Sequence, residues 1–217
     1  MNPEDLWFNT PDSPTLCRGG SNGPNHPSQL YAIRKYVEPL ALKENRILTF
    51  LDYGCGSATT LEAIRKNGYN GVIDYTGLDI IPKNIEWCKE NFPGTDFRVN
   101  KTIHEIYQPD KSFDVVYSRH VVDHMESFEK ALDEHKRVAK KLVIVVLWVG
   151  LSNQDEHEIK NIDYRPSGGK LYPNEYTNIY SDKKVTEYLN SDPEWKLLEF
   201  NKDVQGDQVI VLRRKDA

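Results

Sequence analysis

Two glycines and two carboxylates lie at the spacing that a nucleoside-binding site needs. Gly54 and Gly56 interrupt the chain directly after an apolar run, and Asp52 ends that run. Glycine lets the backbone approach a ligand closely, and free N–H groups at the start of a following helix point outward. Asp79 lies roughly 20 residues beyond the turn, where a carboxylate can accept hydrogen bonds from ribose hydroxyls. These residues predict a site for a ligand that contains a nucleoside.

The glycine spacing also bears on which ligand the turn takes. The dinucleotide-binding pattern G-x-G-x-x-G requires a third glycine, which permits close packing of helix and strand. Thr59 stands at that position, so the sequence disfavours a nicotinamide-dependent oxidoreductase. Two simpler alternatives stay open. The glycines can form a tight turn that binds no ligand, and Asp79 can be a helix N-cap ahead of Pro82.

A second polar group follows the apolar stretch 113–117, where Ser118, Arg119 and His120 are consecutive and His124 comes shortly after. Ligands of open α/β sheets bind at the carboxyl ends of the strands, so we expect these residues to border the reacting atoms. An imidazole takes a proton near neutral pH, which makes His120 either the general base or a hydrogen-bonded structural histidine. Arg119 either holds an anionic substrate group or pairs with an acid. His124 either contacts the substrate or braces the turn.

The stretch 151–180 is polar and rich in tyrosine. A long segment without secondary structure of its own is usually functional or disordered. Tyr164, Tyr172 and Tyr176 can stack on a ring or sugar and bond its hydroxyls, or they can pack on their own domain. His157 is a reserve candidate for the general base.

Apolar runs alternate with amphipathic stretches along most of the chain. The apolar runs predict strands at 47–53, 72–79, 96–100, 112–118 and 142–149. The stretches between them predict helices at 61–66, 82–92 and 126–140. This alternation predicts an α/β fold with a parallel sheet covered by helices on both faces. The runs 195–200 and 208–213 are joined by a short turn and predict an antiparallel hairpin at the sheet's edge.

The 217 residues fit one domain, preceded by a segment of loop composition. Residues 1–27 are rich in Pro, Gly, Asn and Ser and predict a flexible arm or a lid. The range 28–217 is then a single domain. Ser28 caps a helix that Pro39 ends or kinks. The helix after the glycine turn is capped by Ser57 or Thr59, and His135 is expected at the surface or an interface.

Composition narrows the class of protein. The net charge is −5 without a basic cluster, which disfavours nucleic acid as a partner. Three cysteines without a C-x-x-C pair argue for a reducing compartment and against a disulfide framework or a zinc site. No signal peptide and no apolar run of roughly 20 residues is visible, so we expect a cytoplasmic protein without a membrane segment. The oligomeric state stays open.

The glycine stretch Asp52-Tyr53-Gly54-Cys55-Gly56-Ser57-Ala58 resembles the acidic-x-G-x-G-x-G motif of the class I S-adenosylmethionine-dependent methyltransferases, with Ala58 in place of the last glycine. The stretch Val121-Val122-Asp123-His124 resembles the Val-Leu-Glu-His that follows the fourth strand in small-molecule members of that family. The parallel sheet that ends in an antiparallel hairpin also resembles this family. The resemblance extends over about residues 47–214.

The resemblance implies S-adenosylmethionine as the cofactor. It assigns the cofactor to Asp52, Gly54, Gly56, Asp79, Ile80, Thr102, Ile103 and Ser118, with Thr102 standing where the family has an adenine-contacting acid. It places the acceptor against Arg119, His124, Tyr164, Tyr172 and Tyr176, and it makes 151–180 an insertion on the acceptor side. The aspartates of catechol-type metal sites are not evident, so we expect no metal.

The implied reaction is methyl transfer to an oxygen or nitrogen atom of a small molecule, and a hydroxylated or sugar-like acceptor fits best. His120 or His157 would be the general base if the acceptor is a hydroxyl. Two alternatives stay open. One is a methyltransferase that acts on nucleic acid or protein, and the other is a binding module that holds the cofactor without catalysis.

Overall fold

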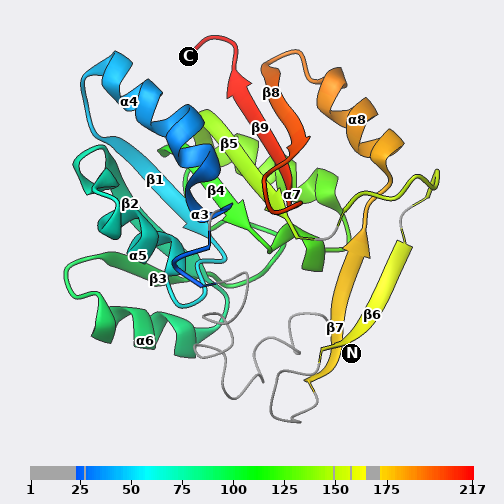
Figure 1. Cartoon of the computed structure of the whole chain (residues 1–217), viewed down its shortest axis with the longest axis horizontal. Helices are drawn as coiled ribbons and strands as arrows, with labels where there is room; N and C mark the ends of the chain where they lie inside the picture. The colour runs from blue at the N-terminus through cyan, green and yellow to red at the C-terminus, as the bar shows by residue number, and fades with distance from the viewer. Residues whose placement is uncertain (1–22, 27, 149, 157, 165–171) are drawn as a thin grey trace.

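A seven-stranded sheet with the order β3-β2-β1-β4-β5-β9-β8 forms the centre of the molecule (Figure 1). The structure is a computed structural model that describes residues 23–26, 28–148, 150–156, 158–164 and 172–217. The strands of this sheet are β1 (Leu48–Tyr53), β2 (Ile73–Asp79), β3 (Asp96–Val99), β4 (Phe113–Arg119), β5 (Ala139–Leu147), β8 (Trp195–Lys202) and β9 (Gln208–Arg214).

The sheet is parallel from β3 to β5 and antiparallel beyond it. β1 pairs with both β2 and β4 in parallel, and the pairs β2–β3 and β4–β5 are parallel too. β9 runs antiparallel to β5, and β8 runs antiparallel to β9 along the edge. The predicted parallel sheet with a terminal antiparallel hairpin is confirmed. The strand order reverses between β1 and β4, which is where open α/β sheets bind ligands.

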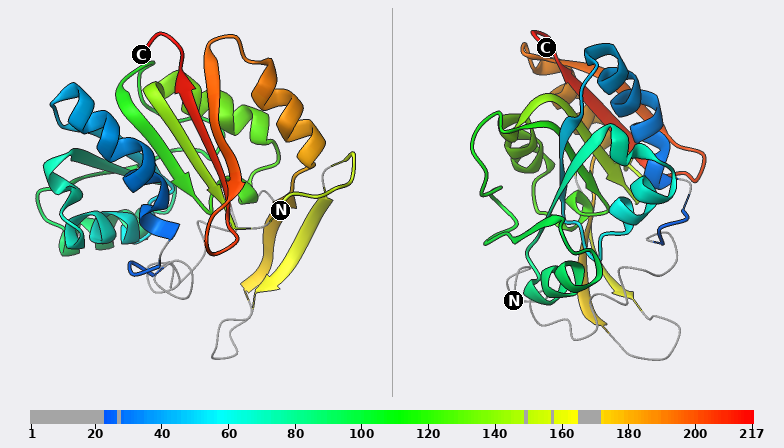
Figure 2. Two further views of the ribbon diagram at one scale, coloured as in Figure 1. Left: turned by 45° about the horizontal axis from the view of Figure 1, so that its top comes forward. Right: turned by 90° about the vertical axis from the view of Figure 1, so that its left-hand side faces the viewer.

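Helices cover both faces of the sheet (Figure 2). They are α3 (Ser28–Ala32), η2 (Ile33–Val37), α4 (Glu38–Glu44), α5 (Thr59–Lys66), η3 (Tyr69–Gly71), α6 (Pro82–Asn91), η4 (Val122–His124), α7 (Phe128–Val138) and α8 (Asp182–Ser191). Along β4, Val115 and Tyr117 pack with α3, α4 and α5, whereas Val116 packs with α7 and α8. Burial on both faces explains why the central strands are almost continuously apolar.

The first helix continues past Pro39, so of the two predicted effects of this proline, an end or a kink, the end is wrong. The segment η2 is a π-helix, in which the N–H of Glu38 donates to the carbonyl of Ile33. Pro39 then lies at the start of α4, where the absence of an N–H costs little, and the helix runs on to Glu44. The wider turn therefore carries the chain through the proline.

The helix after the glycine turn has no side-chain cap, so the predicted cap by Ser57 or Thr59 is wrong. Ala58 precedes α5 in the left-handed conformation, with φ of 57°. The hydroxyls of Thr59 and Thr60 bond the side chain of Gln29 in α3, at 3.2 and 3.0 Å. The start of α5 is thus buried against α3 and not free to cap itself.

The stretch 151–180 contains regular structure that the sequence analysis treated as a loop. β6 (Glu158–Tyr164) and β7 (Tyr172–Ile179) form a separate antiparallel pair, which extends away from the main sheet in Figure 1. The side chains of Asn178 and Tyr180 donate to the carbonyl of Met125, which ties the base of this pair to η4. Strongly polar strands of a two-stranded ribbon lack the apolar pattern that predicts a strand.

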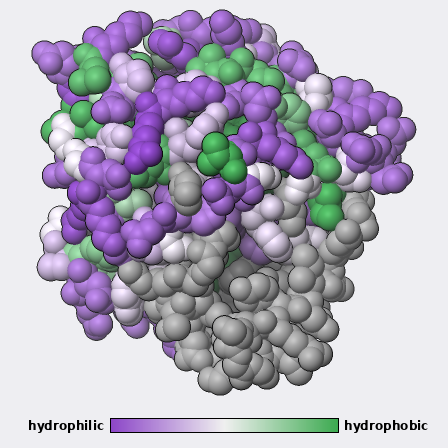
Figure 3. Space-filling model, viewed as in Figure 1, coloured by the Kyte–Doolittle hydropathy of each residue, from purple (hydrophilic) through white to green (hydrophobic). Residues whose placement is uncertain are grey.

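The surface seen in Figure 3 is mostly hydrophilic, with small separate apolar groups. None of the helices that the structure describes has the length and apolar character needed to cross a membrane. The predicted N-terminal arm lies outside the described residues except for 23–26.

Candidate active site

Backbone hydrogen bonds and a close contact with Val121, which follows β4, fix the conformation of the glycine turn. The N–H groups of Gly54 and Cys55 donate to the carbonyl of Leu78 at 2.7 and 2.9 Å. Gly54 has φ of 76°, and a Cβ atom added to it would lie 2.3 Å from Cγ2 of Val121. Gly54 is therefore required by its backbone conformation and by the close approach of Val121, before any ligand is considered.

Asp79 joins the glycine turn to the start of α6. One carboxylate oxygen accepts from the N–H of Gly56 and the other from the N–H of Ile81, both at 2.8 Å. Burial raises the pKa of Asp79, and these two bonds act in the opposite direction. The bond to Ile81 is the cap-like alternative that the sequence left open. Each carboxylate oxygen keeps a second lone pair, so this bond and a ribose contact are compatible.

Asn84 completes a polar pair with Asp79. It lies in the first turn of α6 and is 1% exposed. Its amide makes no hydrogen bond of ordinary geometry within the described part of the chain, although its interaction with the Asp79 carboxylate opposes the rise in the pKa of that group. A buried polar group without a partner is rare and costly, which points to an unmet ligand. A carboxylate that accepts and an amide that both accepts and donates fit the adjacent hydroxyls of a ribose. The sequence analysis missed Asn84 because nothing in the chain order marks it.

Asp52 lies near the end of β1, and its side chain is buried. It is 2% exposed and accepts a hydrogen bond of 2.6 Å from the hydroxyl of Tyr75 in β2. Burial raises the pKa of Asp52 to about 7, although hydrogen bonds from Tyr75 and Thr60 oppose this shift. Asp52 therefore changes its protonation close to neutral pH.

Ser118 faces α7, where it contacts a buried histidine. Nδ1 of His135 lies 2.6 Å from the carbonyl of Ala131 and therefore donates to it. Nε2 then accepts from the Ser118 hydroxyl at 3.0 Å. Burial lowers the pKa of His135 to about 4, so the ring is neutral. The expectation that His135 lies at the surface or an interface is wrong. The residue lies on the face of α7 that packs against the sheet.

The other polar residues at the β4 exit point to the opposite side of the sheet. Nε and Nη2 of Arg119 donate to the Ser28 hydroxyl at 3.2 and 2.7 Å. Nε2 of His120 lies 3.0 Å from a carboxylate oxygen of Asp207, and Nη2 of Arg119 lies 3.5 Å from the same oxygen. His26 is 2.7 Å from the Ser28 hydroxyl. The start of α3 and the turn between β8 and β9 thus meet at the exit of β4.

Asp207 was missed by the sequence analysis. Its stretch, which includes Gly206, is turn-prone and predicted only the hairpin. The partner His120 lies 87 positions earlier, and no local pattern connects the two.

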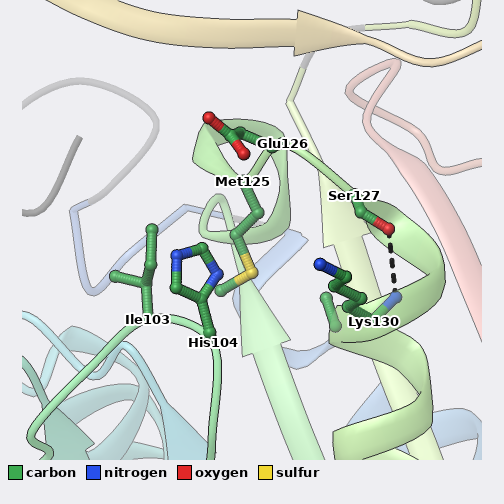
Figure 4. Close-up of a pocket in the computed structure, with 7 residues that line it drawn as sticks. Ile103, His104, Met125, Glu126, Ser127 and Lys130 are labelled. Carbon is green, nitrogen blue, oxygen red and sulfur yellow. Dashed lines mark hydrogen bonds between the residues drawn. The ribbon is translucent and has the colours of Figure 1, made fainter. Parts of the chain in front are cut away.

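The predicted adenine contacts lie in the loop after β3. The carbonyl of Ile103 accepts from the Tyr53 hydroxyl at 3.0 Å, and the hydroxyl of Thr102 accepts from the N–H of His104 at 3.2 Å. Ile80 packs on the core that includes α7. Figure 4 shows a pocket where the β3 loop faces the start of α7, lined by Ile103, His104, Met125, Glu126, Ser127, Lys130 and Ala131.

The acceptor-side candidates are only partly placed. His124 ends η4, beside the base of β7. Tyr164 and Tyr172 are paired across β6 and β7, and Tyr176 pairs with Asn161. His157 lies outside the described residues. Among the residues that the structure describes, no group of three or more His, Cys, Asp or Glu is arranged to hold a metal ion.

Known proteins match part of this sequence and most of its fold. Residues 51–147 match the family model described as a methyltransferase domain. This range includes the glycine turn, Asp79 and the exit of β4, but not Asp207. A ubiquinone biosynthesis O-methyltransferase of Rickettsia typhi is 28% identical over 117 residues, which are 52% of this chain and 46% of that protein. The chain thus spans about half the length of this curated relative.

Solved structures share the fold over almost the whole chain. A SAM dependent methyltransferase from Aquifex aeolicus has a TM-score of 0.57 and 16% identity, and the alignment covers 99% of both chains. The SAM-bound amino pentose methyltransferase from Micromonospora echinaspora has a TM-score of 0.62 and 10% identity over 88% of this chain and 94% of that chain. At such identities the likeness establishes the fold.

Proposed function

We propose that the chain is a class I S-adenosylmethionine-dependent methyltransferase, and that it methylates an oxygen or nitrogen atom of a small molecule. The family match covers Asp52, the glycine turn, Asp79 and the exit of β4. The acceptor side is built from elements of the same chain, namely the β4 exit, the β8–β9 turn and the β6–β7 pair.

When bound, S-adenosylmethionine supplies a methyl group on a sulfonium centre. The observation that carries the proposal is the buried pair formed by Asp79 and Asn84 beside the glycine turn. We assign the ribose hydroxyls to this pair and the polar end of the cofactor to the backbone at Gly54 and Gly56. The adenine lies against Ile80, Thr102 and Ile103. Ser118 and Asp52 stabilise the ends of β4 and β1 beside the cofactor. Ser118 does this through its hydrogen bond with His135, and Asp52 through its hydrogen bond with Tyr75.

We assign the acceptor to Arg119, His120 and His124, which follow β4 in the chain. We also assign Tyr164, Tyr172 and Tyr176 to the acceptor, because a tyrosine ring can stack on a substrate ring or sugar and bond its hydroxyls. The curated relative is named as an O-methyltransferase, and one structural neighbour acts on an amino pentose. Both names favour a hydroxylated or sugar-like acceptor here. The chain's own contribution is to align the reactants and to exclude water.

Calorimetric titration of the purified chain with S-adenosylhomocysteine tests the cofactor site. We expect Asp79→Ala to weaken binding about 10- to 100-fold, because it removes charged hydrogen bonds to the ribose and to Gly56. Asp74→Ala is the matched control, since Asp74 is an exposed carboxylate on the same strand, and it should bind as the wild type does. A folded wild type that does not bind S-adenosylhomocysteine would contradict the proposed function.

A further inference from the structure

One fully buried side chain bonds the loop that follows β3 at three points. Asn100 comes directly after β3 and is 0% exposed. Its Nδ2 donates to the carbonyls of Thr102 and Glu105 at 2.6 and 2.8 Å. Its Oδ1 accepts from the N–H of Tyr107 at 3.1 Å. The side chain therefore closes an irregular segment, residues 100–107, upon itself.

The backbone of Asn100 contacts the other half of the proposed nucleoside site. Its N–H donates to the main-chain carbonyl of Asp79 at 2.8 Å, in register with the parallel pairing of β2 and β3. The proposed function assigns the ribose to the carboxylate of Asp79 and the adenine to Ile80, Thr102 and Ile103, but it gives Asn100 no role. One residue thus connects the strand end assigned to the ribose with the loop assigned to the base.

We propose that Asn100 is a positioning residue, which holds the loop 100–107 in a fixed place relative to Asp79 before the cofactor binds. This inference rests on the proposed function. A ligand gains affinity when the loop that it contacts is already ordered, because binding then costs less conformational entropy. Asn100 acts through the backbone of the loop and needs no contact of its own with the cofactor.

The three partners require an amide at position 100. Two of them are carbonyl oxygens, which only accept, and the third is an N–H, which only donates. An aspartate of the same shape would place a carboxylate oxygen against both carbonyls, and an alanine would remove all three bonds. A backbone group that loses its partner must find another or reach water. We therefore expect the loop to leave its position when Asn100 is replaced.

Other elements bond the rest of the loop, so the domain should stay folded without Asn100. The hydroxyl of Tyr53, at the end of β1, donates to the carbonyl of Ile103 at 3.0 Å. The N–H of Ile106 donates to the carboxylate of Glu134 in α7 at 2.8 Å. Loss of Asn100 should therefore loosen the first part of the loop and leave its far end attached to α7.

The position of the loop also sets the shape of a pocket. Ile103 and His104 line the pocket of Figure 4 from the loop, and Met125, Ser127 and Lys130 line it from the start of α7 and the segment before it. Ile103 lies between the two residues whose carbonyls Asn100 bonds. A displaced loop would therefore change the pocket beside a residue to which the adenine is assigned.

A purely structural role for Asn100 would be to stabilise the fold with no effect on the cofactor. Asn67 offers a matched control, because its side-chain amide also donates and accepts. Its Nδ2 donates to the carbonyl of Ala63 at 2.9 Å, and its Oδ1 accepts from Arg34 at 3.1 Å. These partners lie in α5 and η2, so Asn67→Ala removes bonds of the same kind without removing a bond to the loop.

The experiment compares Asn100→Ala and Asn67→Ala with the wild type in the full chain. Calorimetry measures the affinity for S-adenosylhomocysteine and for its 2′-deoxy analogue, which lacks one of the hydroxyls assigned to Asp79. We expect Asn100→Ala to weaken the binding of both ligands about 10-fold, so that the ratio of the two affinities keeps its wild-type value. Asn67→Ala should bind both ligands as the wild type does.

Hydrogen exchange of the backbone amides of residues 101–107 measures the order of the loop directly. Without ligand, these amides should exchange faster in Asn100→Ala than in the wild type, because the Tyr107 N–H has lost its acceptor. S-adenosylhomocysteine should slow the exchange in the variant again. A loop that is equally protected in both proteins would contradict the inference.

Each outcome of the titrations decides the proposal. Wild-type affinity in Asn100→Ala, or an equal loss in Asn67→Ala, would overturn it. A ratio of affinities that falls to one in Asn100→Ala would also overturn it, because the lost contact would then be with the ribose. If Asn100→Ala does not fold, Asn100→Ser replaces it, and unchanged affinity in that variant contradicts the inference. Failure of the wild type to bind S-adenosylhomocysteine is distinct, because it removes the proposed function itself.

Discussion

The strand ends proposed to bind the cofactor (the cofactor edge) and those proposed to face the acceptor (the acceptor edge) are held together by different interactions. At the cofactor edge, backbone N–H groups of Gly54, Gly56 and Ile81 bond a carbonyl or a carboxylate from the neighbouring strand. At the acceptor edge, side chains of three separate segments bond one another around Arg119 and Asp207. Backbone contacts depend on glycine and on conformation, so the first edge tolerates little change. Side-chain contacts depend on charge, so the second edge responds to pH and to single substitutions.

Substitution of Gly54 should produce the largest effect and tests the backbone-held edge directly. Gly54→Val adds a Cβ atom 2.3 Å from Val121 and forces a β-branched residue into the left-handed region. We expect the free energy of unfolding to fall by about 5 kcal/mol, from overpacking and backbone strain together. Denaturant unfolding measures this change.

The same position offers an internal control. Val121→Ala removes the two methyl groups nearest the added Cβ atom. In Gly54→Val with Val121→Ala, the part lost to overpacking should return, whereas the part lost to backbone strain should not. A double variant as unstable as Gly54→Val alone would show that Val121 does not constrain the turn.

Asp52 should give the cofactor edge a pH dependence of its own. Because the pKa of Asp52 is raised to about 7 in the folded state from an ordinary value of 3.8, the native state binds more protons between these pH values. Stability should therefore fall as the pH rises from about 4 to about 7, by roughly 4 kcal/mol relative to Asp52→Asn. Urea unfolding of both proteins across this range measures the difference.

Asp114, at the start of β4, should change the stability in the opposite direction as the pH changes. Hydrogen bonds from Arg46 and Thr49 overcome the effect of burial and lower the pKa of Asp114 to about 2. Its contribution is present above the ordinary value and is lost as the pH falls toward 2. The same slope in Asp52→Asn and Asp114→Asn would show that Asp52 is not buried as described.

Substitution of Ser118 should have the smallest effect. It tests whether the hydroxyl contacts the cofactor or only bonds His135 of α7. Ser118→Ala leaves Nε2 of the neutral His135 without its donor, at a cost of about 1–2 kcal/mol in the free energy of unfolding. Affinity for S-adenosylhomocysteine should not change, because the hydroxyl faces α7. Ser112→Ala removes an exposed hydroxyl from the opposite end of β4 as a control. Weaker cofactor binding by Ser118→Ala alone would make Ser118 a direct contact.

The two edges also differ in how far the sequence predicts them. The glycine turn and Asp79 are local patterns, in which a turn or a strand end carries its own signal. The parallel sheet follows from the alternation of apolar runs and amphipathic stretches. Asp207 has no such signal, because its role depends on the pairing of β9 with β5. Asn84 and His135 were missed for a related reason, since helical periodicity alone does not say which polar residue a helix buries.

Errors in the predicted elements have physical causes of the same kind. Pro39 normally ends a helix, but the π-helix before it removes the need for its N–H. The β6–β7 strands are too polar to show a strand pattern and are instead held by main-chain pairing and by their junction with η4. In both cases neighbouring structure outweighed local preference.

The insertion of β9 between β5 and β8 has a consequence for biosynthesis. On the ribosome, the glycine turn and Asp79 emerge early and can assemble with β1, β2 and β4 while translation continues. Until Gln208–Arg214 has left the exit tunnel, β5 presents an open apolar edge, and nascent chains of this length are exposed to aggregation. A chain that stalls before β9 would therefore carry the glycine turn and Asp79 while the edge of β5 stays uncovered.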